Sequence, residues 1–311
     1  MKRLTDNKII LVTRSTRFEE LISRFNTMEQ AKFYIEHLGA DFSDYENEHR
    51  GYHEALKATD QQLRELGRVQ VLDRAFLTNF VFGPEDLVVV LGQDGLVANT
   101  LKYVDGRPII GVNPDAERWD GVLLPFTVSD VSTVVLDVFG RKRSLREITM
   151  ARARLNNGQM LHGVNDLFIG HRSHVSARYE LAVGRKHERQ SSSGIIVSTG
   201  LGSTGWLKSV LAGARGIGAA LGSSFGSDVL KDFRWESDYL YYSVREPFPS
   251  RSSEAALVFG RVTQKQPLTL VSQMPENGVI FSDGIESDFL EFNSGMQAVV
   301  DVADKKGYLV V

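Results

Sequence analysis

One stretch, residues 87–115, constrains the fold more than any other part of the chain. It begins with the apolar run Leu87–Leu91, breaks at the turn Gly92-Gln93-Asp94-Gly95 and continues as an amphipathic segment. A short apolar run rich in β-branched residues is typical of a buried parallel strand, and glycines directly after it allow a sharp turn into a helix. The N–H groups at the start of such a helix attract anions such as phosphate. The carboxylate of Asp94 lies within this turn, where a loop that only held phosphate would not favour a negative charge.

The elements around this stretch alternate between strand and helix. Apolar runs at 8–13, 69–72 and 108–112 predict further strands, and the spacing of apolar residues predicts one helix over 18–38 and a second over 43–66, capped by Ser43. Strands and helices in this order are typical of a parallel α/β sheet.

The sequence after Pro125 has a different pattern. Short β-type runs separated by Gly, Ser and Asn clusters predict a mainly antiparallel second domain, with one helix over about 203–221. These runs are 133–138, 167–169, 179–183, 194–197, 240–244, 256–259, 268–271, 279–281, 298–302 and 308–311. The fold class that we expect is therefore α/β plus all-β, with a parallel α/β domain over residues 1–125 and a β-rich domain over residues 126–311.

Composition excludes several classes of function. A net charge of −3 gives no general attraction to nucleic acid or to an anionic membrane. The absence of cysteine excludes disulfides, thiolate metal sites and a cysteine nucleophile. No apolar window is long enough to cross a membrane, and the first predicted strand begins so early that we expect no leader segment and a cytoplasmic protein.

Two groups of ionisable residues invite a functional interpretation. Six basic residues lie between Arg141 and Arg154; we interpret them as the solvated face of charged strands, with phosphate contact as the alternative. Four histidines, His162, His171, His174 and His187, lack the spacing of metal ligands, so we expect no metal ion held by the protein itself.

Three stretches, taken together and in this order, resemble the NAD kinase family. GQDGL at 92–96, followed by Gly-Val-Asn at 111–113, is similar to the family's GGDGT phosphate loop. GVNDLFI at 163–169 is similar to its N-[ED] motif, and GIIVSTGLGSTGW at 194–206 is similar to its GLIVSTPTGSTAY signature. The long helical insertion before the phosphate loop resembles the divergent mitochondrial-type branch, and we expect a bacterial member of that branch.

The resemblance implies a reaction and a set of residues. NAD kinases transfer the terminal phosphoryl group of ATP to the 2′-hydroxyl of the adenosine ribose of NAD, so it implies NAD and ATP as partners, Mg²⁺ with the ATP, and a homodimer. It assigns the role of catalytic base to Asp94. Phosphate-binding roles fall on Gly92, Gln93, Gly95 and Asn113, and NAD-binding roles fall on Asn165, Asp166, Ser198, Thr199, Ser203, Thr204, Trp206 and Ser209.

Each of these residues also has an ordinary structural interpretation. Asp94 can form an Asx turn or cap a helix, the Asn165-Asp166 step can be a strand-entry turn, and hydroxyls at a helix start are commonly caps. The phosphate loop also departs from the family at Gln93 and Leu96. If position 93 required a positive φ, glutamine there would cost about 1 kcal/mol.

Two other functions therefore stay open. The loop also resembles that of diacylglycerol-type kinases, which allows a kinase of another small hydroxyl substrate such as a sugar or lipid. A chain that kept the pocket and lost turnover through Gln93 and Leu96 would instead be an NAD-binding sensor. The third motif departs as well, with Gly200 and Leu201 in place of the usual Pro-Thr.

Overall fold

The computed structural model describes residues 8–223 and 229–311, which form two compact units. The first unit contains the chain up to Arg146 together with Tyr308–Val311, and the second contains Glu147–Gly307. Residues 126–146, which the sequence analysis placed in the second domain, therefore pack in the first unit. Residues 1–7, on which the expectation of no leader segment rests, lie outside the described residues. Within the described part of the chain, no helix is long and apolar enough to cross a membrane.

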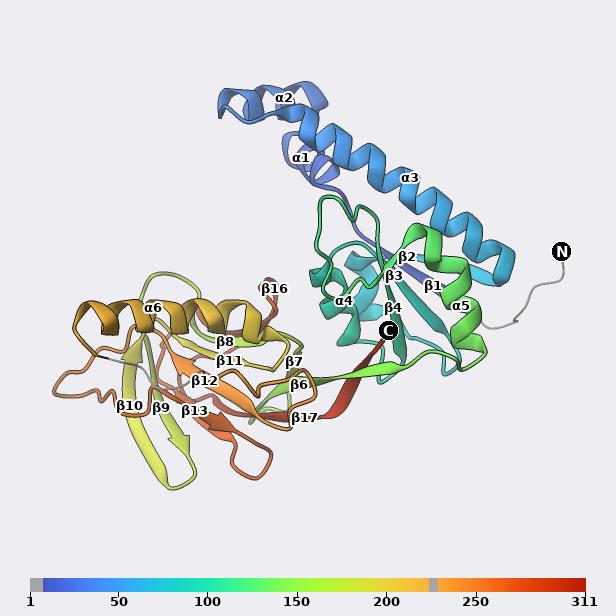
Figure 1. The fold of residues 1–311 in the computed structure, drawn as a ribbon. Helices are drawn as coiled ribbons and strands as arrows, with labels where there is room; N and C mark the ends of the chain where they lie inside the picture. The colour runs from blue at the N-terminus through green and yellow to red at the C-terminus, as the bar shows by residue number, and fades with distance from the viewer. Residues whose placement is uncertain (1–7, 224–228) are drawn as a thin grey trace. The chain divides into compact units, whose positions relative to one another are not determined.

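A parallel sheet forms the centre of the first unit (Figure 1). Its strand order is β2-β1-β3-β4, and both β5 and the end of β17 pair in parallel with β4. The strands are β1 (Lys8–Thr13), β2 (Arg68–Asp73), β3 (Leu87–Leu91), β4 (Pro108–Asn113), β5 (Phe126–Thr127) and β17 (Gln297–Val310). All five residues of β3 are buried, as its continuous apolar run predicts, so the expected parallel α/β sheet is confirmed.

Both faces of this sheet are covered. The long helix α3 and the helix α5 share one core cluster with Leu11, Val89 and Val112 of the sheet. Side chains alternate across a strand, and Val88 and Val90 on the opposite face are also fully buried. The helices of this unit are α1 (Arg17–Phe25), α2 (Met28–His37), α3 (Phe42–Leu66), α4 (Asp94–Leu101) and α5 (Val131–Phe139), with short 3₁₀ turns η1 (Arg74–Asn79) and η2 (Val128–Asp130).

Two of the expected elements in this unit were wrong. The run 133–138 is part of helix α5 and not a strand, because Val131, Val134 and Val135 recur at helical spacing and bury one face against the sheet. A short apolar run does not by its pattern distinguish a strand from a buried helix. The single helix expected over 18–38 is two helices, separated at Asn26, which has a left-handed φ of 65°. The cap of α3 is Asp41, which accepts the Ser43 N–H at 2.8 Å.

The second unit is built from two sheets with a shared core. One is a six-stranded antiparallel sheet of order β13-β12-β11-β8-β15-β16, and the other contains β10-β9-β14-β17 with β6 and β7. Both sheets contribute to one cluster of buried residues, with Leu167 and Val197 from the first and Tyr179 and Leu270 from the second. The strands are β6 (Leu145–Leu155), β7 (Met160–Gly163), β8 (Asp166–His171), β9 (Ala177–Val183), β10 (Lys186–Ser192), β11 (Ile195–Ser198), β12 (Leu240–Val244), β13 (Phe259–Val262), β14 (Leu268–Ser272), β15 (Gly278–Ser282) and β16 (Ile285–Glu291).

The expectation of a mainly antiparallel second domain is confirmed, with several changes of detail. The strand expected over 256–259 begins only at Phe259 and runs to Val262, and the strands β6, β7, β10 and β16 were not expected. The runs 298–302 and 308–311 belong to a single long strand, β17. The helix α6 (Trp206–Ala220) follows the 3₁₀ turn η3 (Gly202–Thr204) and packs through Leu207 against Phe233 and Tyr241. The six-stranded sheet therefore carries its buried core on one face and helix α6 on the other.

Candidate functional site

The turn after β3 has the backbone expected of a strand-to-helix connection. A Cβ added to Gly92 would lie 2.8 Å from Leu96 Cδ2, so the turn packs closely, but a small movement of the Leu96 side chain would admit a larger residue. Gln93 is the N-cap residue of α4 and has φ −119°, which is extended backbone. The strain considered for glutamine at this position is therefore absent. No atom lies within 4 Å of a Cβ added to Gly95, so packing does not require glycine at that position.

Both carboxylate oxygens of Asp94 accept backbone hydrogen bonds. The Leu123 N–H donates to Oδ1 at 2.7 Å, and the Val122 N–H donates to Oδ2 at 3.2 Å. Asn113, at the end of β4, holds the same loop: its Nδ2 donates to the Trp119 carbonyl at 2.9 Å. Asp94 and Asn113 thus share a structural function, which is to fold the loop that follows β4 back onto the turn.

Sequence reasoning missed a buried arginine beside this turn. Arg14 follows β1, is only 9% exposed, and lies with its Cδ 3.8 Å from the position of a Cβ on Gly92. Its Nη2 donates to Glu48 Oε1 at 2.8 Å, while its Nε has no hydrogen-bond partner. Partial burial opposes ionisation of Glu48, but hydrogen bonds from Arg14 and Arg17 outweigh it and lower the pKa of Glu48. A positive group is thus fixed at the edge of the sheet where the turn lies.

In the second unit, the backbone of the Asn165-Asp166 step is held by an acid that the sequence analysis did not single out. Asp283 lies in the turn between β15 and β16 with φ 55°. Its Oδ1 accepts the Val164 N–H at 2.9 Å and the Asn165 N–H at 2.6 Å. An Asp-Gly pair between two strands is a common hairpin signal, but no local pattern shows that its carboxylate reaches a distant strand.

The environment of Asp166 favours its neutral form. The residue is 7% exposed, and burial raises the pKa of its carboxyl to about 7, with the negative charge of Asp283 adding to the effect. A carboxyl group with this pKa changes charge in the physiological range, and perturbed groups of this kind are frequent at functional sites.

The third motif packs directly against this step. Thr199 Oγ1 donates to the Val164 carbonyl at 2.6 Å, and the Thr199 N–H donates to the Asn165 carbonyl at 2.9 Å. A Cβ on Gly202 would lie 2.0 Å from the Asn165 carbonyl oxygen, and one on Gly200 would lie 1.6 Å from the Arg234 carbonyl oxygen. The departure from the family's proline at position 200 therefore has a packing reason, because only glycine fits there.

The hydroxyls of this motif divide into two groups. Ser198 donates to the Thr199 carbonyl at 3.0 Å and Ser203 donates to the Gly200 carbonyl at 2.7 Å, so these side chains already stabilise the loop. Thr204 is exposed, and Ser209 is exposed with a long 3.4 Å bond to the Gly205 carbonyl. Their assignment as NAD ligands stays a prediction.

An aromatic cavity of about 530 Å³ adjoins β8 and the start of α6. The ring of Trp206 stacks on Phe168 at 5.7 Å between centroids, and the guanidinium of Arg245 lies 5.3 Å from the Trp206 ring. His171 and His174, whose spacing predicted no metal site, line the same cavity. Stacked rings beside a cation provide a surface suited to a planar, negatively charged ligand.

Three of the six basic residues between Arg141 and Arg154 form ion pairs with aspartates. Arg152 forms ion pairs with Asp301 and Asp304 of β17, and Arg154 also contacts Asp301. Arg143 pairs with Asp137 of α5. Arg152 is buried on β6 and Arg143 precedes that strand, so the interpretation of the run as a solvated strand face does not hold for these two residues.

Replacing Asp166 by asparagine should make the protein more stable in a pH-dependent way. Below about pH 4 the folded and unfolded forms are both protonated at Asp166 and its ionisation costs nothing. As the pH rises, the unfolded carboxyl ionises at its ordinary pKa of 3.8 while the folded one stays neutral until about 7, so stability is lost over this range. The gain in Asp166→Asn should grow from near zero at pH 4 to at most on the order of 4 kcal/mol above pH 7. Urea unfolding at several pH values measures it; a difference independent of pH would contradict the prediction.

Sequence comparison relates part of the chain to known NAD kinases. No family model matches the chain. It is 24% identical over 251 residues to human mitochondrial NAD kinase 2, a match covering 64% of this chain and 57% of the human protein. It is 34% identical over 131 residues to the NAD kinase of Cupriavidus pinatubonensis, covering 39% of this chain and 41% of that protein. The matches thus span about half the length of these curated relatives.

Solved structures match nearly the whole chain. An Archaeoglobus fulgidus NAD kinase in complex with ATP aligns with a TM-score of 0.55 at 14% identity, over 98% of this chain and 93% of that one. Yeast NADH kinase complexed with NADH aligns with a TM-score of 0.56 at 15% identity, over 99% and 84%. At identities this low, the structural alignments show a shared fold and nothing more specific. The chain is therefore similar in sequence to NAD kinases over part of its length and shares the fold of the solved NAD kinase structures.

Proposed function

We propose that this protein is an NAD kinase, which transfers a phosphoryl group from ATP to the 2′-hydroxyl of the adenosine ribose of NAD. The observation that carries the proposal lies in the second unit. There the Asn165-Asp166 step and the Ser198–Trp206 motif, far apart in sequence, are hydrogen-bonded into one structure by Thr199. Two of the three stretches that resemble the family are therefore in contact with each other in the folded chain.

In this proposal the second unit binds NAD. The Asn165 side chain offers a donor and an acceptor to an adenine edge, and Asp166, once ionised, accepts hydrogen bonds from ribose hydroxyls. The stacked rings of Trp206 and Phe168, with Arg245 above them, provide an apolar and cationic wall for part of the dinucleotide. Because the pKa of Asp166 is about 7, we expect NAD affinity to increase as pH rises from 6 to 8.

The first unit supplies the groups that phosphoryl transfer needs. The N–H groups of the first turn of α4 lack partners within the helix and can face a phosphate of MgATP, in which Mg²⁺ spreads the developing charge. Asp94 is the proposed base for the ribose hydroxyl. Each of its oxygens accepts one backbone N–H, from Val122 or from Leu123. To act as the base, one oxygen must give up this hydrogen bond and accept one from the substrate hydroxyl.

One experiment tests the reaction directly. Purified protein incubated with MgATP and NAD should form NADP, measured enzymatically over time, and omission of either substrate should abolish the signal. Parallel reactions with polyphosphate and with NADH identify the donor and the acceptor. Failure to form NADP or NADPH under all these conditions would overturn the proposal.

One observation favours a second candidate, the NAD-binding sensor. Asp94 already anchors a loop, so a chain could keep this acid for structural reasons after losing turnover. Such a protein would bind NAD in calorimetry and make no NADP. The homodimer implied by the resemblance is expected whether the protein is a kinase or a sensor. Light scattering after gel filtration measures the oligomeric state.

A further inference from the structure

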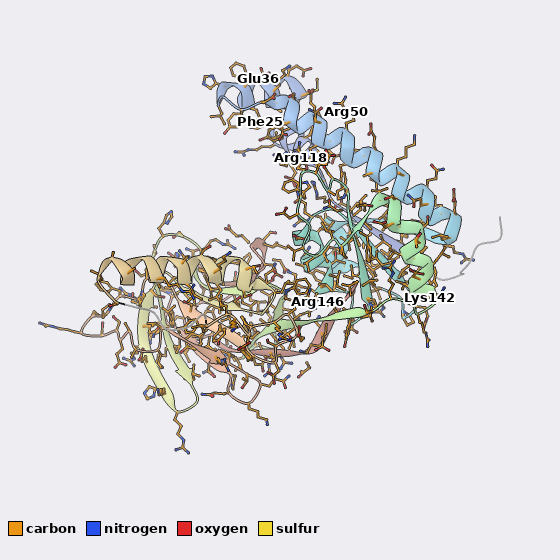
Figure 2. All side chains as sticks on the ribbon, viewed as in Figure 1. Phe25, Glu36, Arg50, Arg118, Lys142 and Arg146 are labelled. Atoms are coloured by element: carbon orange, nitrogen blue, oxygen red, sulfur yellow. The ribbon has the colours of Figure 1, made fainter. Side chains whose placement is uncertain are left out.

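Two histidines and a carboxylate meet on the surface of the first unit, in the helical insertion. His49 and His53 are four residues apart on α3 and therefore share a face, and Glu19 lies on α1, which packs beside the start of α3. One ligand atom from each of the three lies within 4.8 Å of the other two. Figure 2 labels Arg50, which follows His49 on α3, and Phe25 at the end of α1. None of the three residues belongs to the motifs of the proposed kinase site.

The distances suit a shared ion. His53 Nε2 and Glu19 Oε1 are 3.1 Å apart. Two ligands held about 2.1 Å from a tetrahedral ion are separated by about 3.4 Å, so this pair would have to open by only a few tenths of an ångström. The ring of His49 lies edge-on to that of His53, with centroids 4.3 Å apart. The three ligand atoms lie within 4.8 Å of one another, so the farthest pair would have to approach by at most about 1.4 Å to share one ion.

The surroundings fix the orientation of His49. Its Nδ1 lies 2.9 Å from Thr16 Oγ1, and Phe18 packs on the ring with centroids 4.8 Å apart. When Nδ1 carries the proton and donates it to Thr16, Nε2 keeps a free lone pair. A hydrogen bond of this kind to the second ring nitrogen is the usual support of a metal-bound histidine.

The same threonine also fixes Glu19. Thr16 is the N-cap of α1, and its N–H donates to Glu19 Oε2 at 2.8 Å in a capping box. One oxygen of Glu19 is thus held by the backbone, and the other, Oε1, points to His53. Thr16 therefore orients both the carboxylate and one imidazole of the group.

We propose that Glu19, His49 and His53 bind one divalent transition-metal ion of the zinc class. Two imidazoles and one carboxylate favour such ions over Mg²⁺ or Ca²⁺, which prefer oxygen ligands alone. Three protein ligands leave a coordination position for water. Because Glu19 is half-buried and His53 is exposed, the ion exchanges with solvent. It joins α1 to α3 and so fixes the turn that connects β1 to α1.

The sequence analysis expected no metal ion held by the protein, and it considered only the histidines after residue 160. The i,i+4 spacing of His49 and His53 is a recognisable signal on a helix. The third ligand comes from another helix, and only the fold shows that Glu19 is near.

Metal titration of the whole protein tests the site. After treatment with a chelator and buffer exchange, calorimetry with Zn²⁺ should show saturable binding of one ion per chain. Co²⁺ should give the intense visible bands of a four-coordinate nitrogen and oxygen site. His49→Ala, His53→Ala and Glu19→Gln should each weaken Zn²⁺ binding at least tenfold. The controls Glu54→Gln, the exposed neighbour of His53, and His37→Ala, an exposed histidine of α2, should bind as the wild type does.

Stability gives an independent measurement that does not depend on kinase activity. Zn²⁺ at a hundredfold excess over its dissociation constant should raise the melting temperature of the wild type and of both controls. At the same Zn²⁺ concentration it should raise that of His49→Ala by at most about half as much, because a tenfold weaker site is filled less favourably. Circular dichroism without metal shows whether each variant is folded. Absence of saturable binding, or binding that survives the combined replacement of His49 and His53, would overturn the proposal.

Discussion

Asp94→Asn should lower the turnover of NAD to NADP by about three orders of magnitude, since removal of a general base costs roughly 10²–10⁴ in rate. Asparagine has nearly the same shape and leaves the second unit untouched, so NAD binding measured by calorimetry should change little. This combination of lost turnover and retained binding distinguishes a base from a residue that only holds substrate.

The structural function of Asp94 makes a second variant necessary. Asparagine can accept only one of the two N–H groups that Asp94 now accepts, so part of any loss comes from loosening the loop. Asn113→Ala loosens the same loop at the Trp119 carbonyl and leaves the Asp94 carboxylate in place. We expect a smaller loss of turnover in Asn113→Ala. An equal loss in both variants, or full activity in Asp94→Asn, would remove Asp94 from the role of base.

Gly202→Ala should destabilise the protein by about 3 kcal/mol or more, because overpacking a rigid interior typically costs 1–3 kcal/mol and the atoms that the new methyl group meets belong to the backbone of Asn165, which cannot rotate away. The added Cβ would lie 2.0 Å from the Asn165 carbonyl oxygen. The second unit has the size at which 1 kcal/mol shifts the melting temperature by about 2–4 °C, so we expect a decrease of about 6–12 °C.

A second glycine provides the matched control. Gly213 lies inside α6, and no atom lies within 4 Å of a Cβ added there. Gly213→Ala should leave the melting temperature unchanged or raise it, since alanine is favoured over glycine in a helix by about 1 kcal/mol. Scanning calorimetry measures both variants. Similar melting temperatures for the wild type and Gly202→Ala would show that the motif does not require glycine for packing.

Patterns within a few residues predicted most of the architecture. The apolar run Leu87–Leu91 and the glycine after it indicated a buried strand and a turn, and both are present. The run 133–138 was misassigned because its valines satisfy both a strand and a buried helix, and only the sheet beneath α5 decides between them. Local patterns thus predict an element well where the length of the apolar run, or a glycine or proline beside it, distinguishes a strand from a helix.

The candidate site was less predictable because its contacts are long-range. Residues that resemble a motif, such as Asn165 and Asp166, could be found from the sequence. The charged residues that contact these motifs could not be found in this way. No sequence pattern links Asp283 to Asn165 or the buried Arg14 to the turn at Gly92. The raised pKa of Asp166 likewise depends on burial and on a charge from another hairpin.

The contact between Asp283 and the backbone near Asn165 also has a consequence for folding. Asp283 lies 119 residues beyond Val164, so this bond closes a very long loop. Contacts of such sequence separation form slowly, because the chain entropy of closing the loop is lost before the contact stabilises anything. During synthesis the strand that carries Asp166 leaves the ribosome long before the turn that completes its surroundings. The region proposed to bind NAD should therefore be among the last parts of the second unit to become ordered, and a chain truncated before Asp283 should retain strands but lack the hydrogen bonds that hold the Asn165-Asp166 step.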